Sequence, residues 1–169
     1  PAGLQLISMP YDYSTTDPAT LLGIDPDDLL MATWESGSQR YRLYPQAPAD
    51  AFRLGRGYWL RLPRPADITM QGTDAPDPTL IPLSPGWNLI GAPFTRVIDF
   101  YSATVIDRGG NAYTVQRALS EGLLEGGMFA YALSGYQNTS VFNPWVGTWL
   151  RAREPVTLRV STVGALSSA

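Results

Sequence analysis

The residues best suited to ligand binding are tryptophans that should share a strand face with arginines. Trp59 and Arg61 lie two residues apart in a Gly-x-Trp-Leu-Arg phrase, and Trp149 and Arg151 occupy the same positions where the phrase returns. Successive side chains of a strand point to opposite faces, so each pair is predicted to lie on one face. An exposed indole can stack on a sugar ring while a guanidinium donates hydrogen bonds to the sugar hydroxyls.

The same pattern also fits a packing role. An indole can fill the space between a sheet and a loop while the arginine stem covers it, in a contact worth about 0.5–1 kcal/mol at an exposed site. Because Trp59 and Trp149 recur in a repeated phrase, we favour a shared core contact for them. Trp34 and Trp145 have no partner in the other copy and are better candidates for an open platform. The candidate ligand-binding residues are therefore Trp34, Trp59, Arg61, Trp145, Trp149 and Arg151.

Acidic residues give little support to metal binding or catalysis. Asp25, Asp27 and Asp28 offer the oxygen ligands that Ca²⁺ takes, but they lack the spacing of a calcium-binding loop. Glu35, at the tip of a predicted hairpin, has no evident carboxylate partner for glycoside hydrolysis. We therefore assign no metal site and no catalytic residue, and we expect a protein that is not an enzyme.

The composition excludes several kinds of active site. The 169 residues contain no His and no Cys, and all 12 basic residues are Arg. This excludes nucleophiles activated by His, zinc or haem ligated by His or Cys, disulfides, and lysine Schiff bases. A net charge of −3 offers no basic surface for phosphates, so nucleic acid is not an expected partner. We expect no cofactor and, since no apolar run reaches about 18 residues, no membrane span.

Three phrases occur twice in the same order. Residues 3–11 (Gly-Leu-Gln-Leu-Ile-Ser-Met-Pro-Tyr) return at 86–94 as Gly-Trp-Asn-Leu-Ile-Gly-Ala-Pro-Phe. The Gly-x-Trp-Leu-Arg phrases follow, and then Pro-led segments at 65–70 and 155–160, each of which we expect to form a terminal strand. The first phrases are 83 residues apart and the others 90, which fits one longer loop in the second copy. A repeat of this kind indicates a duplicated structural unit.

The pattern predicts a mostly β protein made of two similar antiparallel units, residues 1–72 and 79–161. Each unit should be a small barrel or sandwich with one short helix. Units of this size without disulfides have thin cores, so we expect the two to pack together. Residues 162–169 are predicted to be a tail similar to a linker, and the opening at Pro1, within a motif, leads us to expect a mature form or a piece of a larger protein.

Local signals predict the individual elements. Asp17, Pro18 and Gly23 are typical of the N-cap, first position and stop of a short helix. The other predicted elements are a hairpin of 31–34 and 40–44, a strand at 79–83 paired with 87–92, a helix within 113–124, and a hairpin of 128–133 and 139–142 joined through 134–138.

The phrase Gly-Trp-Asn-Leu-Ile-Gly-Ala-Pro at 86–93 resembles a repeat module of large bacterial secreted and surface proteins. Such modules open with Gly-Trp-Asn-Leu-Ile/Val-Ser-x-Pro and later carry Pro-Gly-x-Gly-Tyr-Trp-Val, to which residues 53–60 are similar. The chain departs from the pattern at Leu4, where the pattern has Trp, and at Thr148, where the pattern has Tyr. The resemblance implies a β-rich accessory unit beside catalytic or adhesive domains.

We therefore expect a non-catalytic accessory, structural or adhesion module of a bacterial secreted or cell-surface protein, located outside the cell or at its surface. Its expected partners are other domains of a larger polypeptide, cell-surface proteins or the cell wall. The alternative is a carbohydrate-binding module that uses exposed tryptophans on polysaccharide. An open indole beside Arg or Asp would favour sugar binding, whereas coverage of all five tryptophans would favour the structural role.

Overall fold

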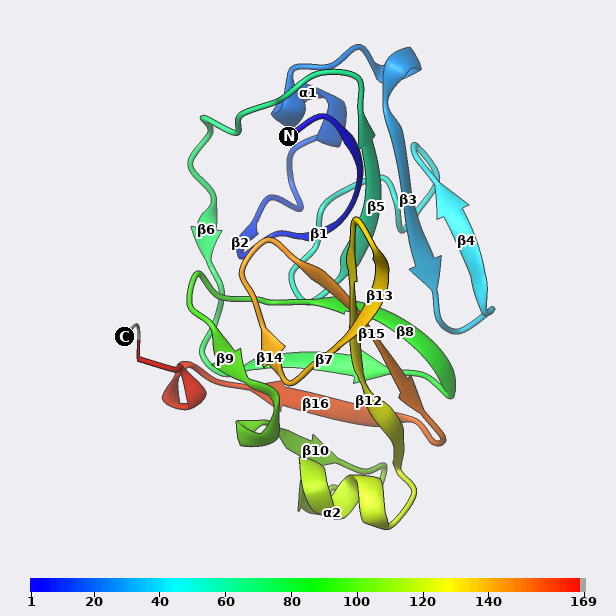
Figure 1. Ribbon diagram of the computed structural model, residues 1–169, viewed down its shortest axis with the longest axis vertical. Coiled ribbons are helices and arrows are strands. Elements are labelled where there is room, and N and C mark those ends of the chain that lie inside the picture. The colour runs from blue at the N-terminus through cyan, green and yellow to red at the C-terminus, as the bar shows by residue number, and fades with distance from the viewer. Residues whose placement is uncertain (168–169) are drawn as a thin grey trace.

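The two copies of the repeated sequence fold into four-stranded antiparallel sheets with the same strand order (Figure 1). The computed structural model describes residues 1–167. The first sheet, in the order β1-β5-β3-β4, consists of β1 (Gly3–Ser8), β3 (Leu30–Glu35), β4 (Arg40–Leu43) and β5 (Gly57–Leu62). The second, in the order β8-β15-β12-β13, consists of β8 (Gly86–Gly91), β12 (Leu124–Ala132), β13 (Gly135–Thr139) and β15 (Gly147–Ala152). The prediction of a mostly β protein with two repeated antiparallel units is confirmed.

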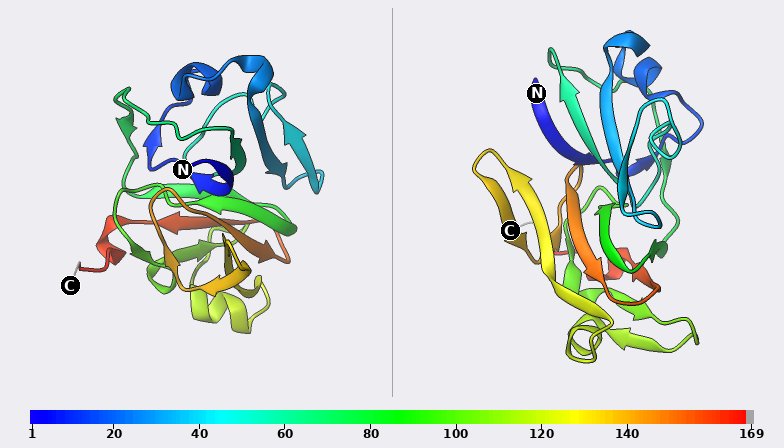
Figure 2. Two further views of the ribbon diagram at one scale, coloured as in Figure 1. Left: turned by 45° about the horizontal axis from the view of Figure 1, so that its top comes forward. Right: turned by 90° about the vertical axis from the view of Figure 1, so that its right-hand side faces the viewer.

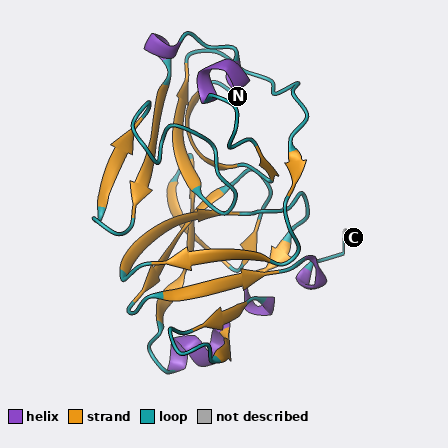
Figure 3. Cartoon of the chain, turned by 180° about the vertical axis from the view of Figure 1, so that it is seen from behind, coloured by secondary structure: helices purple, strands orange, loops and turns teal. Residues whose placement is uncertain are grey.

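A third four-stranded sheet, two short strand pairs and several short helices complete the structure. A further sheet, in the order β11-β10-β16-β7, consists of β7 (Thr79–Leu83), β10 (Thr104–Ile106), β11 (Ala112–Thr114) and β16 (Val156–Val160). Two short pairs are formed by β2 (Tyr11–Asp12) with β6 (Thr73–Asp74), and β9 (Ile98–Asp99) with β14 (Val141–Phe142). The helices are α1 (Pro18–Leu22), α2 (Val115–Ser120) and the 3-10 turns η1 (Pro26–Asp28), η2 (Phe100–Ser102) and η3 (Thr162–Gly164). Helices α1 and α2 lie at opposite ends of the molecule (Figure 3).

The Pro-led segment 65–70 of the first unit is not a strand, contrary to prediction. Its counterpart β16 lies between β7 and β10 and pairs with both. Among the described residues the first unit has no equivalent of β7, so segment 65–70 has no such ladder to join. Its Ala66 and Ile68 instead pack against the core of the first unit.

Strand β7 pairs with β16 and not, as predicted, with β8. The side chain of Asn88 occupies the turn between β7 and β8. Its Oδ1 accepts from the backbone N of Ser84 at 2.9 Å, and its Nδ2 donates to the carbonyls of Ser84 at 2.9 Å and Gly86 at 3.1 Å. These bonds replace a hairpin ladder, so the backbone of β7 remains available to the other sheet.

The first helix matches its prediction, and the second is shorter than predicted. Asp17 caps α1 by accepting from the N–H of Thr20 at 3.0 Å, and Gly23 ends it in a left-handed conformation, with φ of 63°. Helix α2 stops at Ser120, because Gly122 turns the chain with φ of 78° before β12 begins at Leu124.

The first hairpin, β3 with β4, is confirmed, whereas the second turns earlier than predicted. Its turn comes at residues 133 and 134, because Gly135 adopts φ of 110° and starts β13 at once. Residues 141 and 142 belong to β14, which pairs with β9.

The predicted tail, 162–169, begins as a packed segment of the second unit and not as a linker. Ala165 forms a bridge with Ile98, and the N–H of Leu166 donates to the carbonyl of Val97 at 2.9 Å. These contacts fix the segment on the strand that precedes η2. The last two residues of the chain lie outside the described part.

The two units lie against each other (Figure 2), and the contacts that join them are the same in both directions. Ile7, at the end of β1, bridges Val146 just before β15, and Ile90, at the end of β8, bridges Arg56 just before β5. One residue further on, the N–H of Ser8 donates to the carbonyl of Trp145 at 3.1 Å and that of Gly91 to the carbonyl of Gly55 at 3.2 Å. The units are therefore related by a pseudo-twofold arrangement in which the first strand of each sheet forms a bridge with the other unit.

Each unit has its own buried core, and a third cluster lies between them. On β5 the side chains of Tyr58, Leu60 and Leu62 are buried, while Trp59 is partly buried and Arg61 exposed on the opposite face, as predicted. Trp59 belongs to the cluster between the units, which contains Leu6, Trp34, Trp59, Leu89, Phe129, Tyr131 and Trp149.

Candidate functional site

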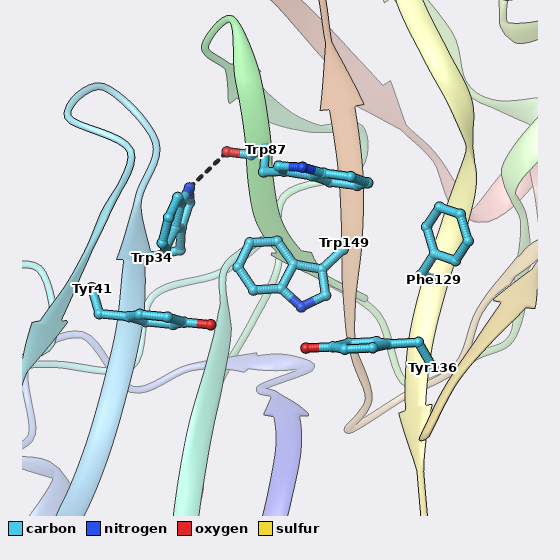
Figure 4. Close-up of a pocket in the computed structure, with 6 residues that line it drawn as sticks. All are labelled: Trp34, Tyr41, Trp87, Phe129, Tyr136 and Trp149. Atoms are coloured by element: carbon cyan, nitrogen blue, oxygen red, sulfur yellow. Dashed lines mark hydrogen bonds between the residues drawn. The ribbon is translucent and has the colours of Figure 1, made fainter. Parts of the chain in front are cut away.

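A groove of about 470 Å³ lies between the two units and is lined by aromatic side chains (Figure 4). We name it the aromatic groove. Its lining residues are Trp34 of β3 and Tyr41 of β4 from the first unit, and Trp87 of β8, Phe129 of β12, Tyr136 of β13 and Trp149 of β15 from the second. Its volume lies in the range of about 300–1,000 Å³ that is usual for ligand pockets.

Strand register brings these side chains together. Trp34 lies directly opposite Tyr41 on the β3–β4 ladder, and Phe129 directly opposite Trp149 on the β12–β15 ladder. Opposed residues of neighbouring strands point to the same face of the sheet. The groove therefore forms where the aromatic faces of two ladders, one from each unit, meet.

Trp149 lies at the centre of the lining. Its ring centroid is 5.6 Å from that of Trp34, 6.3 Å from that of Trp87 and 6.4 Å from that of Tyr41, with interplanar angles of 75°, 86° and 85°. Figure 4 shows the Trp149 ring face-on with these rings edge-on around it. Such edge-to-face pairs contribute about 0.5–1.5 kcal/mol each beyond their buried area, so the groove is largely pre-formed.

Hydrogen bonds tie the first hairpin to β8 beside the groove. The indole N–H of Trp34 donates to the carbonyl of Trp87 at 2.8 Å. The side chain of Gln39 donates to the same carbonyl at 3.0 Å and accepts from the N–H of Trp87 at 2.9 Å. The backbone polar groups of Trp87 and the indole N–H of Trp34 are thus already occupied.

The indole N–H of Trp149 is buried and has no hydrogen-bond partner among the described residues. It points toward the space between the hydroxyls of Tyr41 and Tyr136 (Figure 4). The Tyr136 hydroxyl lies beside this N–H, but the contact does not meet the geometry of a full hydrogen bond. Burial raises the pKa of Tyr136 and the phenol of Tyr41 raises it further, against a smaller lowering by the interaction with Trp149, so the hydroxyl keeps its proton at neutral pH. An unsatisfied buried donor costs about 1–3 kcal/mol.

None of the lining side chains carries a charge at neutral pH. Arg151 lies over the aromatic wall, with its guanidinium 5.9 Å from the centroid of the Trp87 ring. Its Nη1 lies 3.2 Å from Oε1 of Glu125, and Nε of Arg153 lies 3.3 Å from Oε2 of the same carboxylate. The groove is therefore an apolar surface with a few hydrogen-bonding groups and a charge-compensated edge.

The structure divides the sequence-predicted residues between three places. Trp34 and Trp149 line the aromatic groove, and Arg151 lies over the ring of Trp87, which also lines it. Trp59 and Arg61 line a second hollow of about 300 Å³ whose other residues are mostly aliphatic.

Trp145 lies apart from the aromatic groove. Its ring is exposed, and its centroid is 6.4 Å from that of Tyr11. It adopts φ of 68°, where the first unit has Gly55 at 73°.

Four lining residues were missed by sequence reasoning. Trp87 and Phe129 occupy positions where the first unit has Leu4 and Ala32, so no repeat pointed to them. Tyr41 and Tyr136 occupy equivalent hairpin positions. The repeat of a tyrosine on both outer hairpin strands was a signal that could have found them.

In the acidic segment 25–28, Asp25 serves as a local cap. Asp25 accepts from the N–H of Asp27 at 3.0 Å and so begins η1. In the described range, no cluster of three or more acidic side chains is arranged to hold a metal ion. No helix within residues 1–167 is long and apolar enough to cross a membrane.

Comparison with models of known protein families finds none that matches the chain, and neither the curated proteins nor the solved structures give a match.

Proposed function

We propose that this chain is a non-catalytic module that binds a protein partner through the aromatic groove. The observation that carries this proposal is the meeting of six aromatic side chains from both units in one open groove. Aromatic residues are enriched in the cores of protein interfaces and among the residues that dominate binding energy.

The pseudo-symmetry supports a binding role over a packing role. At the equivalent positions on the other side of the molecule, Leu4 and Ala32 stand in place of Trp87 and Phe129. The fold therefore does not require large aromatic rings at these positions. Trp87 nevertheless leaves 38% of its surface exposed beside the groove, where a bound partner would bury it.

We further propose that the module belongs to a larger secreted or cell-surface protein, where its partners are other domains or neighbouring surface proteins. The support is the resemblance of residues 86–93 and 53–60 to accessory repeats of bacterial surface proteins.

Carbohydrate binding is the second candidate function. The exposed indole of Trp87 with the guanidinium of Arg151 above it is the combination that favours sugar recognition. Trp145 is also exposed, so two of the five tryptophans offer open surface.

A random peptide library displayed on phage tests the proposal. The selection is run on the wild-type protein and on Trp87→Leu and Phe129→Ala, which install the residue types of the first unit. We expect peptides that are enriched on the wild type and lost on both variants. Tyr101→Ser, which removes an exposed aromatic outside the lining, is the matched control and should retain them.

The absence of any enriched peptide would overturn protein binding. Titration with soluble polysaccharides, followed by tryptophan fluorescence, tests the second candidate on the same variants. A shift with a polysaccharide that Trp87→Leu abolishes, without peptide enrichment, would establish carbohydrate binding in its place.

A further inference from the structure

The hydrogen-bonding groups of the aromatic groove select one kind of polypeptide. We propose that the groove binds a proline-rich segment in the extended polyproline conformation. This inference rests on the proposed function as a protein-binding module and specifies its ligand.

The first argument is the imbalance of donors and acceptors. The N–H of Trp149 is an unpartnered donor within a side chain that is only 9% exposed. The hydroxyls of Tyr41 and Tyr136 can each donate as well as accept, whereas the carbonyl of Trp87 already accepts from Trp34 and Gln39. A proline-rich segment offers carbonyl acceptors and no backbone N–H at its prolines. It therefore matches what the groove leaves unsatisfied.

The second argument is access to the buried donor. Tyr41 and Tyr136 cover the Trp149 N–H, and both side chains remain exposed to solvent. Rotation of either phenol lets a ligand carbonyl take the N–H without moving the backbone. A ligand carbonyl that accepts from this N–H would satisfy a donor that is otherwise buried without a full hydrogen bond, which favours binding.

The third argument is shape and rigidity. The rings of Trp34 and Trp87 stand nearly perpendicular to Trp149, so they form walls against which pyrrolidine rings can pack. A polyproline helix is already extended before binding, with 3 residues per turn, and loses little entropy when it docks on an aromatic-lined groove.

Other ligand classes fit less well. A sugar ring would bury several hydroxyls, each both donor and acceptor, against a lining whose polar atoms are two phenol oxygens and indole nitrogens. An organic cation would meet no carboxylate in the lining and would approach the guanidinium of Arg151 over Trp87.

The test uses a synthetic peptide of ten prolines as the probe and a ten-residue alternating Gly-Ser peptide as the control ligand. The whole protein is labelled with ¹⁵N, and the indole N–H resonances of its five tryptophans are followed during titration. We expect the decaproline to move the Trp149 resonance downfield, as its N–H gains an acceptor, and the Gly-Ser peptide to move none.

Binding by the variants provides the second readout. We expect Trp87→Leu and Phe129→Ala each to weaken decaproline binding at least tenfold, and Tyr136→Phe about threefold. Tyr101→Ser should bind as the wild type does. Circular dichroism of each variant, matched to that of the wild type, excludes loss of fold as the cause.

Several outcomes would overturn the inference. Equal affinity for the Gly-Ser peptide, or an unmoved Trp149 resonance at saturation, would do so. Peptides without proline that the display selection enriches on the wild type and loses on Trp87→Leu would also overturn it, and would leave the protein-binding function standing. A polysaccharide that shifts the same resonance while decaproline does not would overturn both.

Discussion

The ring of Trp59 in the first unit packs edge to face on that of Tyr131 in the second, with centroids 4.9 Å apart and an interplanar angle of 74°. Trp149 makes the same contact with Trp34 in the opposite direction, at 5.6 Å and 75°. Because Trp59 and Trp149 occupy equivalent positions, the repeated tryptophan is a contact between the units. The residues around the two tryptophans differ, and the aromatic groove lies beside Trp149 only.

Replacing Gly57 or Gly147 with Ala should destabilise the protein by about 1–3 kcal/mol each, because an added methyl group overpacks the junction. A Cβ at Gly57 would lie 2.8 Å from the carbonyl oxygen of Ile90, and one at Gly147 would lie 2.8 Å from that of Ile7. Urea unfolding measures the loss. Gly37→Ala, whose Cβ meets nothing within 4 Å, is the control. A large effect at one junction glycine and none at the other would contradict the pseudo-twofold relationship.

We expect the Trp145→Gly variant to be more stable than the Trp145→Ala variant by about 1 kcal/mol. At most positions Ala is the more stabilising of the two residues. Trp145 has φ of 68°, a conformation that the first unit assigns to Gly55. Thermal unfolding of Trp145→Gly and Trp145→Ala compares the two directly, since both lose the contact with Tyr11. If the Ala variant proved the more stable, the backbone there would not be strained.

Stability should fall as the pH rises from about 10 to about 12. The side chain of Tyr58 is buried, and burial raises its pKa from 10.0 to about 12. Between these values the unfolded chain has lost the phenol proton while the folded protein keeps it, so high pH favours unfolding. The loss amounts to about 3 kcal/mol at most, since one pKa unit corresponds to about 1.4 kcal/mol.

Tyr58→Phe separates this contribution from those of other tyrosines. The variant should be less stable at neutral pH by about 1–3 kcal/mol, because the hydroxyl accepts from the N–H of Arg53 and donates to the carbonyl of Ala51, each at 2.8 Å. Its stability should depend less steeply on pH above 10. Urea unfolding at pH 9 and pH 11.5 gives the slopes, and identical slopes would refute the assignment.

Asn88→Asp should cost about 3 kcal/mol at neutral pH, because a carboxylate would face carbonyls that now receive hydrogen bonds. The Nδ2 of Asn88 donates to the carbonyls of Ser84 and Gly86, and the side chain is 2% exposed. Protonation restores a donor, so the deficit relative to the wild type should shrink at pH 4. A deficit that does not change between pH 7 and pH 4, measured by urea unfolding, would argue against these contacts.

Much of the fold could be predicted because its signals are local. The alternation of Tyr58, Trp59 and Leu60 defines a strand with one buried face, and Asp17 with Gly23 defines a helix by its ends. The pairing partner of a strand is not local. Nothing in residues 79–83 specified β16 over β8, since β16 lies more than 70 residues further along the chain and meets β7 only in the folded structure.

The site was less predictable than the fold for a related reason. Trp34 and Trp149 could be singled out by residue type, but they come together only because two units meet. Trp87 looked like part of a structural phrase, and its exposure depends on which strand lies beside it. Composition therefore identified candidates, while the packing of one unit on the other decided which of them form a groove.

The reciprocal bridges of Ile7 with Val146 and of Ile90 with Arg56 have a consequence for ancestry. A lone copy of the unit would leave the end of its first strand without this bridge, and association with a second, identical copy as a homodimer would restore it. In a homodimer any change to one groove is imposed on both. Once two copies were joined in a single gene, Trp87 could diverge from Leu4, and one of two formerly identical surfaces could specialise.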